Sequence, residues 1–306
     1  MRIRLVVLTV AAVLAAGCTE AGRPGDAPGR PSADSAEEAS VCDWYLYNRL
    51  LHETGRLIDE AKTTPLETIR AGLANRSCTL ALSPPSRDAM TPADVYARCC
   101  ESILVLAGAW WCDKCNNWHL TISTGFFITA GGAFVTNYHV VDNAKHVTLV
   151  AMFFDPLTDE ATVVPVREVL AASEDDDVAI LQLDAGGRRF RPLALSTDAP
   201  VGSPISVISH PARRFYTLTR GIVARYFLAQ VGEQRREVVP RMHITADFAR
   251  GSSGGPLFNQ RGAVVGFVKS TNSIYYDTSE DKNDDLQMVF KECIPASRVL
   301  KLIREK

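Results

Sequence analysis

The chain has 306 residues, of which 46% are hydrophobic and 22% are charged, and its formal net charge at pH 7 is −2. Removal of the first 17 residues deletes two arginines and no acidic residue, which takes the formal charge from −2 to about −4. Because this balance is mild and no basic cluster occurs, the composition argues against a nucleic-acid-binding protein.

Residues 1–17 are typical of a signal peptide. Arg2 and Arg4 precede an apolar run that ends at Ala16 and is too short to span a bilayer of about 30 Å as a stable anchor. The segment closes with Leu-Ala-Ala-Gly before Cys18, which resembles a bacterial lipobox, where cleavage before the cysteine is followed by its acylation. We therefore expect export from the bacterial cytoplasm and a lipoprotein anchored through Cys18 to a membrane, facing the periplasm or the cell exterior. The alternative is ordinary signal cleavage, which leaves Cys18 as a spare thiol.

The next two segments differ sharply in composition. Residues 18–40 lack aromatic and β-branched aliphatic side chains, so they cannot bury enough apolar surface to fold and are expected to form a disordered tether. Residues 41–90 are expected to form a small helical cap region packed against the first part of the fold. Its apolar residues recur at helical steps of three and four, namely Trp44, Leu46, Tyr47, Leu50, Leu51, Leu57 and Ile58.

From residue 91 onward the pattern is mainly that of a β protein. Thr91-Pro92 is expected to open a short helix that continues to Cys99, and the first strand is expected to begin in 102–106. Short β-branched runs bounded by Gly and Pro follow in 201–211, 221–226 and 262–268, a spacing that favours barrels or a sandwich.

Three motifs in this region carry candidate catalytic residues. A β-branched and aromatic run, 134–141, contains His139 and follows a two-glycine turn, which predicts a hairpin with His139 at a strand end. Asp177 stands directly before the apolar strand Val-Ala-Ile-Leu, where its carboxylate can be buried against an imidazole. Residues 251–256 read Gly-Ser-Ser-Gly-Gly-Pro, a tight turn that presents a serine beside backbone N–H groups.

The three motifs, in the order His, Asp, Ser, resemble those of trypsin-like serine proteases, and within that fold those of the bacterial HtrA-like branch. The likeness covers roughly Val95 to Ile303. It implies a mainly β protease domain over 91–306, with two six-stranded Greek-key β-barrels at about 101–192 and 193–294 and a closing C-terminal helix at 295–305. Since no segment is left for a PDZ module, we expect a member without one.

The chemistry requires these residue types. A serine hydroxyl is a weak nucleophile at neutral pH, so His139 is expected to take the proton of Ser253 as a general base, oriented by Asp177. The backbone N–H groups of Gly251 and Ser253 are expected to form the oxyanion hole. The resemblance thus implies a serine endopeptidase that acts on protein or peptide substrates through an acyl-enzyme, with no cofactor and no metal for catalysis.

Neighbouring residues offer alternatives for two of these roles. Asp176 is the reserve candidate for the acid, because Asp177 closes a run of acidic residues that could be a solvated turn. Ser252 precedes the nucleophile, and the spacing to the double glycine assigns that role to Ser253. Animal digestive enzymes carry an aspartate at the position of Ser252, so activation through a freed N-terminus is not expected here.

Substrate preference depends on an ungapped alignment. By this alignment Asp247 falls at the base of the specificity pocket, which would imply cleavage after Arg or Lys. In HtrA-like sequences an aspartate near this point does not line the base, so a small apolar pocket is preferred. The remaining candidate pocket residues are Phe248, Arg250, Val268, Lys269 and Ser270.

The cysteines permit three interpretations. An exported protein normally pairs its thiols, so structural disulfides are expected, and acylation of Cys18 leaves an odd number. Trp111-Cys112-Asp113-Lys114-Cys115 locally resembles a thioredoxin active site, but a strand is expected where that fold needs a helix. Alternatively, Cys112, Cys115 and His119 could bind zinc together with Cys99 or Cys100. The disulfide or metal candidates are Cys42, Cys78, Cys99, Cys100, Cys112, Cys115 and Cys293.

Two other function classes stay open at this point. One is a catalytically silent protease homologue that acts as a binding module through its barrels and helical cap. The other is a thiol-disulfide enzyme centred on Cys112 and Cys115.

Overall fold

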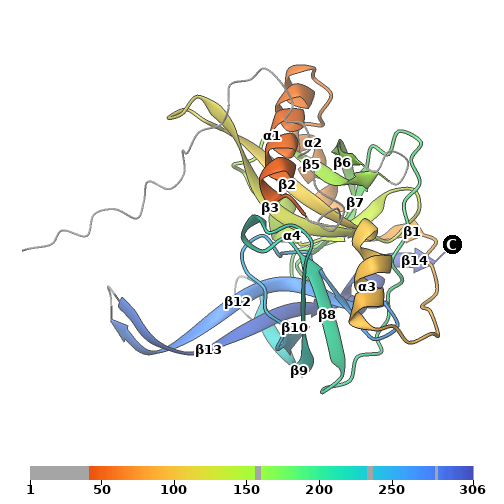
Figure 1. Cartoon of the computed structure of the whole chain (residues 1–306), viewed down its shortest axis with the longest axis vertical. Helices are drawn as coiled ribbons and strands as arrows, with labels where there is room; N and C mark the ends of the chain where they lie inside the picture. Colours follow the sequence, from red (N-terminus) through yellow and green to blue (C-terminus); the bar gives the residue numbers. More distant parts are fainter. Residues whose placement is uncertain (1–40, 156–159, 233–236, 280–281, 306) are drawn as a thin grey trace, which may run out of the picture.

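The computed structural model describes residues 41–155, 160–232, 237–279 and 282–305. The fold is built around two closed β-barrels of six strands each, which sit side by side with helices on their outer surfaces (Figure 1). The expected mainly β class and the pair of six-stranded barrels are therefore confirmed.

The first barrel is built from residues 103–183. Its strands follow the order β2-β3-β4-β7-β6-β5, and β5 pairs with β2 to close the barrel. Alternate residues of β2 enter two different hydrophobic clusters: Val105 and Ala107 belong to one, and Leu104 and Leu106 to the other. The strands are β2 Ile103–Cys112, β3 Asn117–Phe127, β4 Ala133–Thr136, β5 Thr148–Asp155, β6 Glu160–Ser173 and β7 Val178–Leu183.

The second barrel follows the strand order β10-β13-β12-β11-β8-β9. Two of its strands pair far beyond the barrel wall and form a long projecting ribbon, β12 with β13 (Figure 1). The strands are β8 Pro204–Ser209, β9 Thr217–Val231, β10 Glu237–Ile244, β11 Pro256–Phe258, β12 Val264–Ser279 and β13 Lys282–Pro295.

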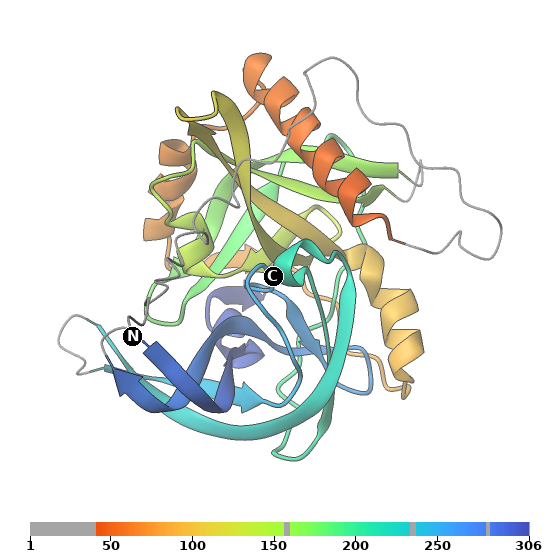
Figure 2. The same cartoon turned by 60° about the vertical axis from the view of Figure 1, so that its left-hand side comes forward.

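The helices of the N-terminal part of the chain cover the outside of the first barrel (Figure 2). Helix α1, Asp43–Asp59, buries Leu46, Leu50 and Leu57. Trp44 belongs to the same predicted apolar stripe but is 65% exposed. Helix α2, Leu66–Ala71, and the 3₁₀ turn η1, Gly72–Ala74, lie against β6. The predicted apolar stripe thus forms a helix, with its first aromatic residue on the outer face.

Helix α3, Pro92–Cys99, begins where the sequence predicts. Thr91 accepts a hydrogen bond from the backbone N–H of Asp94, and the Asp94 carboxylate accepts one from the N–H of Thr91. This capping box satisfies two N–H groups that the first helical turn cannot pair internally. The 3₁₀ turn η2, Cys100–Ser102, then leads directly into β2.

The end of the chain differs from the expected helix over 295–305. Helix α5 spans only Ala296–Leu300, and β14, Ile303–Glu305, pairs in parallel with β1, Cys78–Leu80. The N–H of Cys78 donates to the carbonyl of Leu302 at 2.9 Å. The backbone groups that a longer helix would have satisfied are bound instead by a strand more than 200 residues away in sequence.

Three predictions lie outside the described residues: the signal peptide over 1–17, the tether over 18–40 and the lipidation of Cys18. Within the described ranges, none of the helices combines the length and the apolar character that a membrane span requires.

A buried histidine, His146, lies beside β2. Its side chain packs so closely on Gly108 that an added Cβ there would lie 2.2 Å from the ring. His146 is only 6% exposed, and within the described chain neither ring nitrogen has a hydrogen-bond partner. Burial lowers the pKa of His146 to about 4, because the charged ring loses its hydration.

We expect this residue to make the fold sensitive to acid. Between a pH of about 6.5 and 4 the unfolded chain binds a proton that the folded chain does not, so stability is fully present above this window and falls by about 3 kcal/mol on acidification. His146→Leu should remove that share of the pH dependence and raise the free energy of unfolding near neutral pH by about 1 kcal/mol, because two unsatisfied nitrogens are lost. Urea denaturation of both proteins at neutral and acidic pH measures this, and identical pH slopes would contradict it.

Candidate active site

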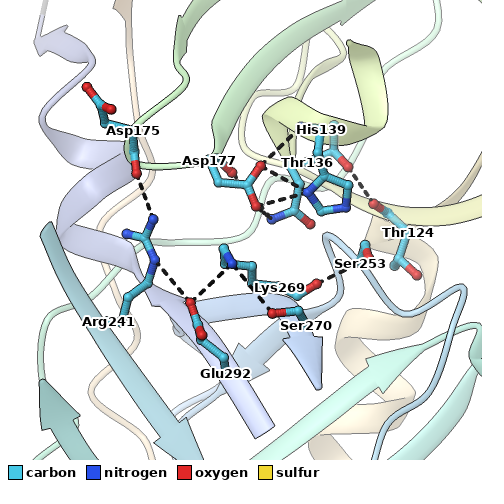
Figure 3. Close-up of polar contacts among 11 residues, drawn as sticks. Thr124, Thr136, His139, Asp175, Asp177, Arg241, Ser253, Lys269, Ser270 and Glu292 are labelled. Atoms are coloured by element: carbon cyan, nitrogen blue, oxygen red, sulfur yellow. Dashed lines mark hydrogen bonds and ion pairs between the residues drawn. The ribbon is translucent and has the colours of Figure 1, made fainter. Parts of the chain in front are cut away.

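A hydrogen-bonded pair, His139 and Asp177, joins the helical turn after β4 to the residue before β7 (Figure 3). His139 belongs to the short helix α4, Tyr138–Val141, which follows β4 after one residue, so it lies on a helical turn and not at the strand end that the sequence suggested. Its Nδ1 is 3.0 and 2.9 Å from the two carboxylate oxygens of Asp177, and its backbone N–H donates to Oδ1 at 3.0 Å. The carboxylate therefore holds both the backbone and the ring of His139.

The two neighbouring aspartates face different partners. Asp177 has a positive φ of 56°, which turns its side chain toward His139, and Asn137 Nδ2 lies 3.3 Å from its carboxylate. Asp176 instead accepts two hydrogen bonds from Arg298 of α5, at 2.7 and 2.9 Å. Asp177 is thus the carboxylate that contacts the imidazole, and Asp176 is part of an ion pair with the C-terminal helix.

The turn that carries Ser253 is bound to the first barrel through two threonines. The N–H of Thr124 donates to the carbonyl of Ser253 at 2.8 Å, and its hydroxyl donates to the carbonyl of Gly251 at 2.9 Å. The Thr136 hydroxyl donates in turn to the carbonyl of Thr124 at 2.9 Å. Because Thr136 lies three residues before His139, these bonds bring the serine turn of the second barrel to the histidine of the first.

Two backbone N–H groups of this turn make no hydrogen bond within the described residues, those of Gly251 and Ser253. The carbonyl of Arg250 accepts from the N–H of Ala212 at 2.6 Å, which fixes the Arg250–Gly251 peptide. In a trans peptide the N–H points opposite to the carbonyl, so the N–H of Gly251 points away from Ala212. Gly251 has φ +100°, and an added Cβ would lie 2.4 Å from the carbonyl oxygen of His210, so only glycine fits here.

The hydroxyl of Ser253 is turned toward the second barrel. It donates to the backbone carbonyl of Lys269 at 3.4 Å, and within the described residues it makes no hydrogen bond to His139. His139 and Lys269 nevertheless line the same cleft. A bond of this length is weak, so it holds the hydroxyl only loosely.

The cleft beside His139 has a volume of about 770 Å³ and carries both signs of charge. Lys269 Nζ lies 3.2 Å from Glu292 Oε1, and Arg241 Nε lies 3.4 Å from the same oxygen (Figure 3). Arg241 also donates to the carbonyl of Asp175 at 2.7 Å, and burial lowers its pKa. The lining residues are His139, Glu174, Asp175, Asp177, Val231, Gly232, Arg241, Lys269 and Ser270.

The sequence did not single out Arg241 or Glu292. They lie on β10 and β13, where a single charged residue reads as an ordinary outward-facing strand position. The pairing of these two strands brings them under the cleft. The one signal in the sequence for Arg241 is an arginine within a strand pattern. If such an arginine is buried, its charge requires a partner nearby.

The candidate pocket residues are divided between the cleft, the core and the surface. Lys269 and Ser270 line the cleft, whereas Phe248 and Val268 belong to the core of the second barrel. The side chain of Asp247 is 87% exposed, and its Oδ1 lies 3.3 Å from Lys291 Nζ. Arg250 is exposed.

Ser252 is fully buried and accepts a hydrogen bond from the Ser209 hydroxyl at 3.0 Å. It therefore stabilises the base of the turn.

The expected disulfides are not formed in the described chain. Cys99 and Cys100 precede β2 and Cys112 ends it, a separation of roughly 30 Å along the strand, whereas a disulfide needs Cα atoms within about 7 Å. The same distance excludes Cys99 and Cys100 from a metal site with Cys112. β3 begins at Asn117, two residues after Cys115, so the helix that a thioredoxin site requires is absent from this segment. The free thiols are Cys42, Cys78, Cys99, Cys100, Cys112 and Cys293.

Known proteins share this domain. Residues 123–267 match the model of the trypsin-like peptidase domain. The chain is 30% identical over 149 residues to Protease Do-like 1, chloroplastic, of Arabidopsis thaliana, which covers 47% of this chain and 31% of that protein. It is 31% identical over 143 residues to a probable periplasmic serine endoprotease DegP-like of Hahella chejuensis, which covers 47% of this chain and 28% of that protein. The chain therefore spans about a third of the length of these relatives.

Solved structures agree with the barrels described above. The crystal structure of Deg5 has a TM-score of 0.51 and 20% identity and covers 68% of this chain and 90% of that chain. The HtrA-type protease AlgW with tripeptide has a TM-score of 0.52 and 18% identity and covers 69% and 62%. At these identities the likeness establishes a trypsin-like fold. The match to the trypsin-like peptidase domain over 123–267 agrees with this fold.

The contact between Gly254 and Thr124 can be tested by substitution. A Cβ at Gly254 would lie 2.0 Å from the Thr124 carbonyl oxygen, and φ is +85°. Gly254→Ala should lower the free energy of unfolding by about 3 kcal/mol or more, the sum of overpacking and left-handed strain. Gly187→Ala is a matched control, because Gly187 has φ +83° and no atom within 4 Å of an added Cβ. Gly187→Ala should lower the free energy of unfolding by only about 1 kcal/mol, as measured by urea denaturation. Equal losses in the two variants would show that the barrels are not in close contact at Gly254.

Proposed function

We propose that this protein hydrolyses peptide bonds as a serine endopeptidase, with Ser253 as nucleophile, His139 as general base and Asp177 as the orienting acid. The observation that carries the proposal is the convergence, beside one cleft, of the His139–Asp177 pair and a serine turn with two unbound N–H groups. The trypsin-like domain match over 123–267 and the serine protease relatives support the same activity.

The tautomer of His139 follows from its partner. A carboxylate only accepts hydrogen bonds, so Nδ1 carries the proton that Asp177 binds, and Nε2 is left with a lone pair. Nε2 takes the hydroxyl proton while the Ser253 oxygen bonds to the scissile carbonyl carbon. The same proton then passes to the leaving amine, and a water molecule, activated by His139, releases the acyl group.

The first step requires a rotation of the Ser253 side chain. In the resting structure its hydroxyl donates to the carbonyl of Lys269 at 3.4 Å. Rotation about χ1 breaks this weak bond and directs the hydroxyl to His139, at a small energetic cost. The N–H groups of Gly251 and Ser253 then bind the negative oxygen of the tetrahedral intermediate, an interaction worth about 3 kcal/mol for each donor.

For substrate preference we favour small apolar side chains at the cleavage position. The exposure of Asp247 and its ion pair with Lys291 support a pocket without this acid at its base. A digest of a peptide library tests the preference, and dominant cleavage after Arg or Lys would reject it.

We further propose that the chain is exported and tethered to a membrane through a lipidated Cys18. The apolar segment and the lipobox-like end at Cys18 support this, and relatives named as periplasmic endoproteases support export.

Substitution of the catalytic residues tests the mechanism directly. Ser253→Ala and His139→Ala should each lower kcat/KM for a peptide substrate by about 10⁴-fold or more, and Asp177→Asn should lower kcat by about 10⁴-fold. Peptide hydrolysis and labelling by a fluorophosphonate probe are the two measurements.

Adjacent residues supply the controls. Ser252→Ala should retain probe labelling, and Asp176→Asn should lower stability through Arg298 while the chemistry proceeds. Wild-type activity in Ser253→Ala would reject the mechanism. A wild-type protein that never labels would favour the silent binding module.

Fractionation of the producing cells tests the anchor. The wild type should appear in the membrane fraction and incorporate labelled fatty acid, whereas Cys18→Ala should do neither, because the thiol that carries the lipid is lost. An unlabelled wild-type protein in the soluble fraction would contradict lipidation.

A further inference from the structure

The β2–β3 hairpin brings three metal-ligating side chains to its tip. β2 ends at Cys112 and β3 begins at Asn117, which pair directly across the hairpin. The ligand atoms of Cys112, Cys115 and His119 all lie within 4.8 Å of one another, and the Cys115 Sγ is 2.9 Å from His119 Nε2. The hairpin extends beyond the first barrel next to α1 (Figure 1).

The backbone of the turn brings the two cysteines together. Asn116 adopts a positive φ of 51°, which folds the four-residue loop back on itself. The Cys115 thiol donates to the backbone carbonyl of Cys112 at 4.0 Å. The loop therefore holds both sulfurs close to each other and to the imidazole before any metal arrives.

Aromatic contacts fix the ligands on a rigid support. The ring of His119 stacks on Trp110, its cross-strand partner, at 4.7 Å. On the opposite face, Trp111 and Trp118 pack edge to face at 5.1 Å. Strand residues two apart share a face, so Cys112 lies on the same side of the hairpin as Trp110 and His119. The imidazole is thus held over the thiols by packing.

We propose that Cys112, Cys115 and His119 bind one Zn²⁺ ion through two thiolates and one imidazole. Two sulfurs and one nitrogen are a donor set that zinc prefers, and its tetrahedral geometry leaves a fourth position for water or a group from a partner. A disulfide between the two cysteines would involve only two of the three converging groups and would give the packed imidazole no role.

The site is separate from the proposed catalytic cleft. Thr124, which binds the serine turn, lies seven residues along β3 from Asn117, or roughly 23 Å. Zinc therefore acts on the structure of the hairpin tip, and its removal leaves the residues of the cleft in place. The role of the metal can be tested without reference to peptidase activity.

The direct test is the metal content and zinc affinity of the reduced full-length chain. After removal of metal under reducing conditions, titration with Zn²⁺ alone should show one ion bound per chain, with a change in the fluorescence of the tryptophans around the site. Loss of an outer-shell partner costs about 10- to 100-fold in metal affinity, so Cys115→Ser and His119→Gln should each weaken binding by at least about 100-fold. Circular dichroism checks that both variants fold.

Matched controls come from the same residue types outside the cluster. Cys42→Ser and His52→Gln, at the cap and on the surface of α1, should bind zinc as the wild type does. Replacement of Zn²⁺ by Co²⁺ should give thiolate-to-metal absorption that His119→Gln alters. Failure of the reduced wild type to bind zinc more tightly than Cys115→Ser would overturn the proposal. A Cys112–Cys115 disulfide in the isolated protein, combined with no zinc binding after reduction, would also overturn it.

Discussion

The geometry of the proposed active site depends on one residue, Thr124, which joins the serine turn of the second barrel to the first. Its N–H binds the carbonyl of Ser253 and its hydroxyl binds that of Gly251, so both ends of the nucleophile turn are fixed to β3. Thr136 continues this chain of hydrogen bonds to the strand that leads into His139. The side chains of Thr124 and Thr136 are fully buried, where an unpaired polar atom costs about 1–3 kcal/mol, so the two barrels cannot separate here without that loss. A serine and a histidine more than 100 residues apart in sequence are thereby held beside one cleft.

Electrostatics around the cleft depend on how the acidic run 174–177 is divided. The positive φ of Asp177 sends consecutive carboxylates in different directions: Asp177 to His139 and Asp176 to Arg298 of the C-terminal helix. The backbone of the same run, at Asp175, accepts a hydrogen bond from the buried Arg241. Because Asp177 and Asp176 bind different partners, the acid beside the imidazole does not compete with its neighbour. The closing helix thus contributes to the order of the site without touching the proposed catalytic residues.

Local sequence signals predicted much of this arrangement. Alternating β-branched runs marked the strands, Thr91-Pro92 marked the start of α3, and the spacing of the Gly-Ser-Ser-Gly-Gly turn singled out Ser253. What could not be predicted depends on contacts between distant segments. The pairing of β1 with β14 replaced the end of the expected helix, and the position of Arg241 under the cleft follows from the pairing of β10 with β13. The resting rotamer of Ser253, bound to Lys269, is likewise set by a second strand. Cysteine counting could not show that β2 places Cys99 and Cys100 far from Cys112.

In the proposed mechanism the serine turn is prearranged for an oxyanion, and the Ser253 side chain alone must rotate. A crystal structure of the protein bound to a peptide boronate, whose boron bonds to a nucleophilic serine, tests this most directly. We expect a covalent bond to Ser253, with one boronate oxygen within about 3.1 Å of both the Gly251 and Ser253 nitrogens. The Arg250 carbonyl should still be bound to Ala212 and the Lys269 carbonyl should have lost its hydroxyl partner. A reoriented Arg250–Gly251 peptide, or a boronate oxygen directed away from the turn, would contradict it.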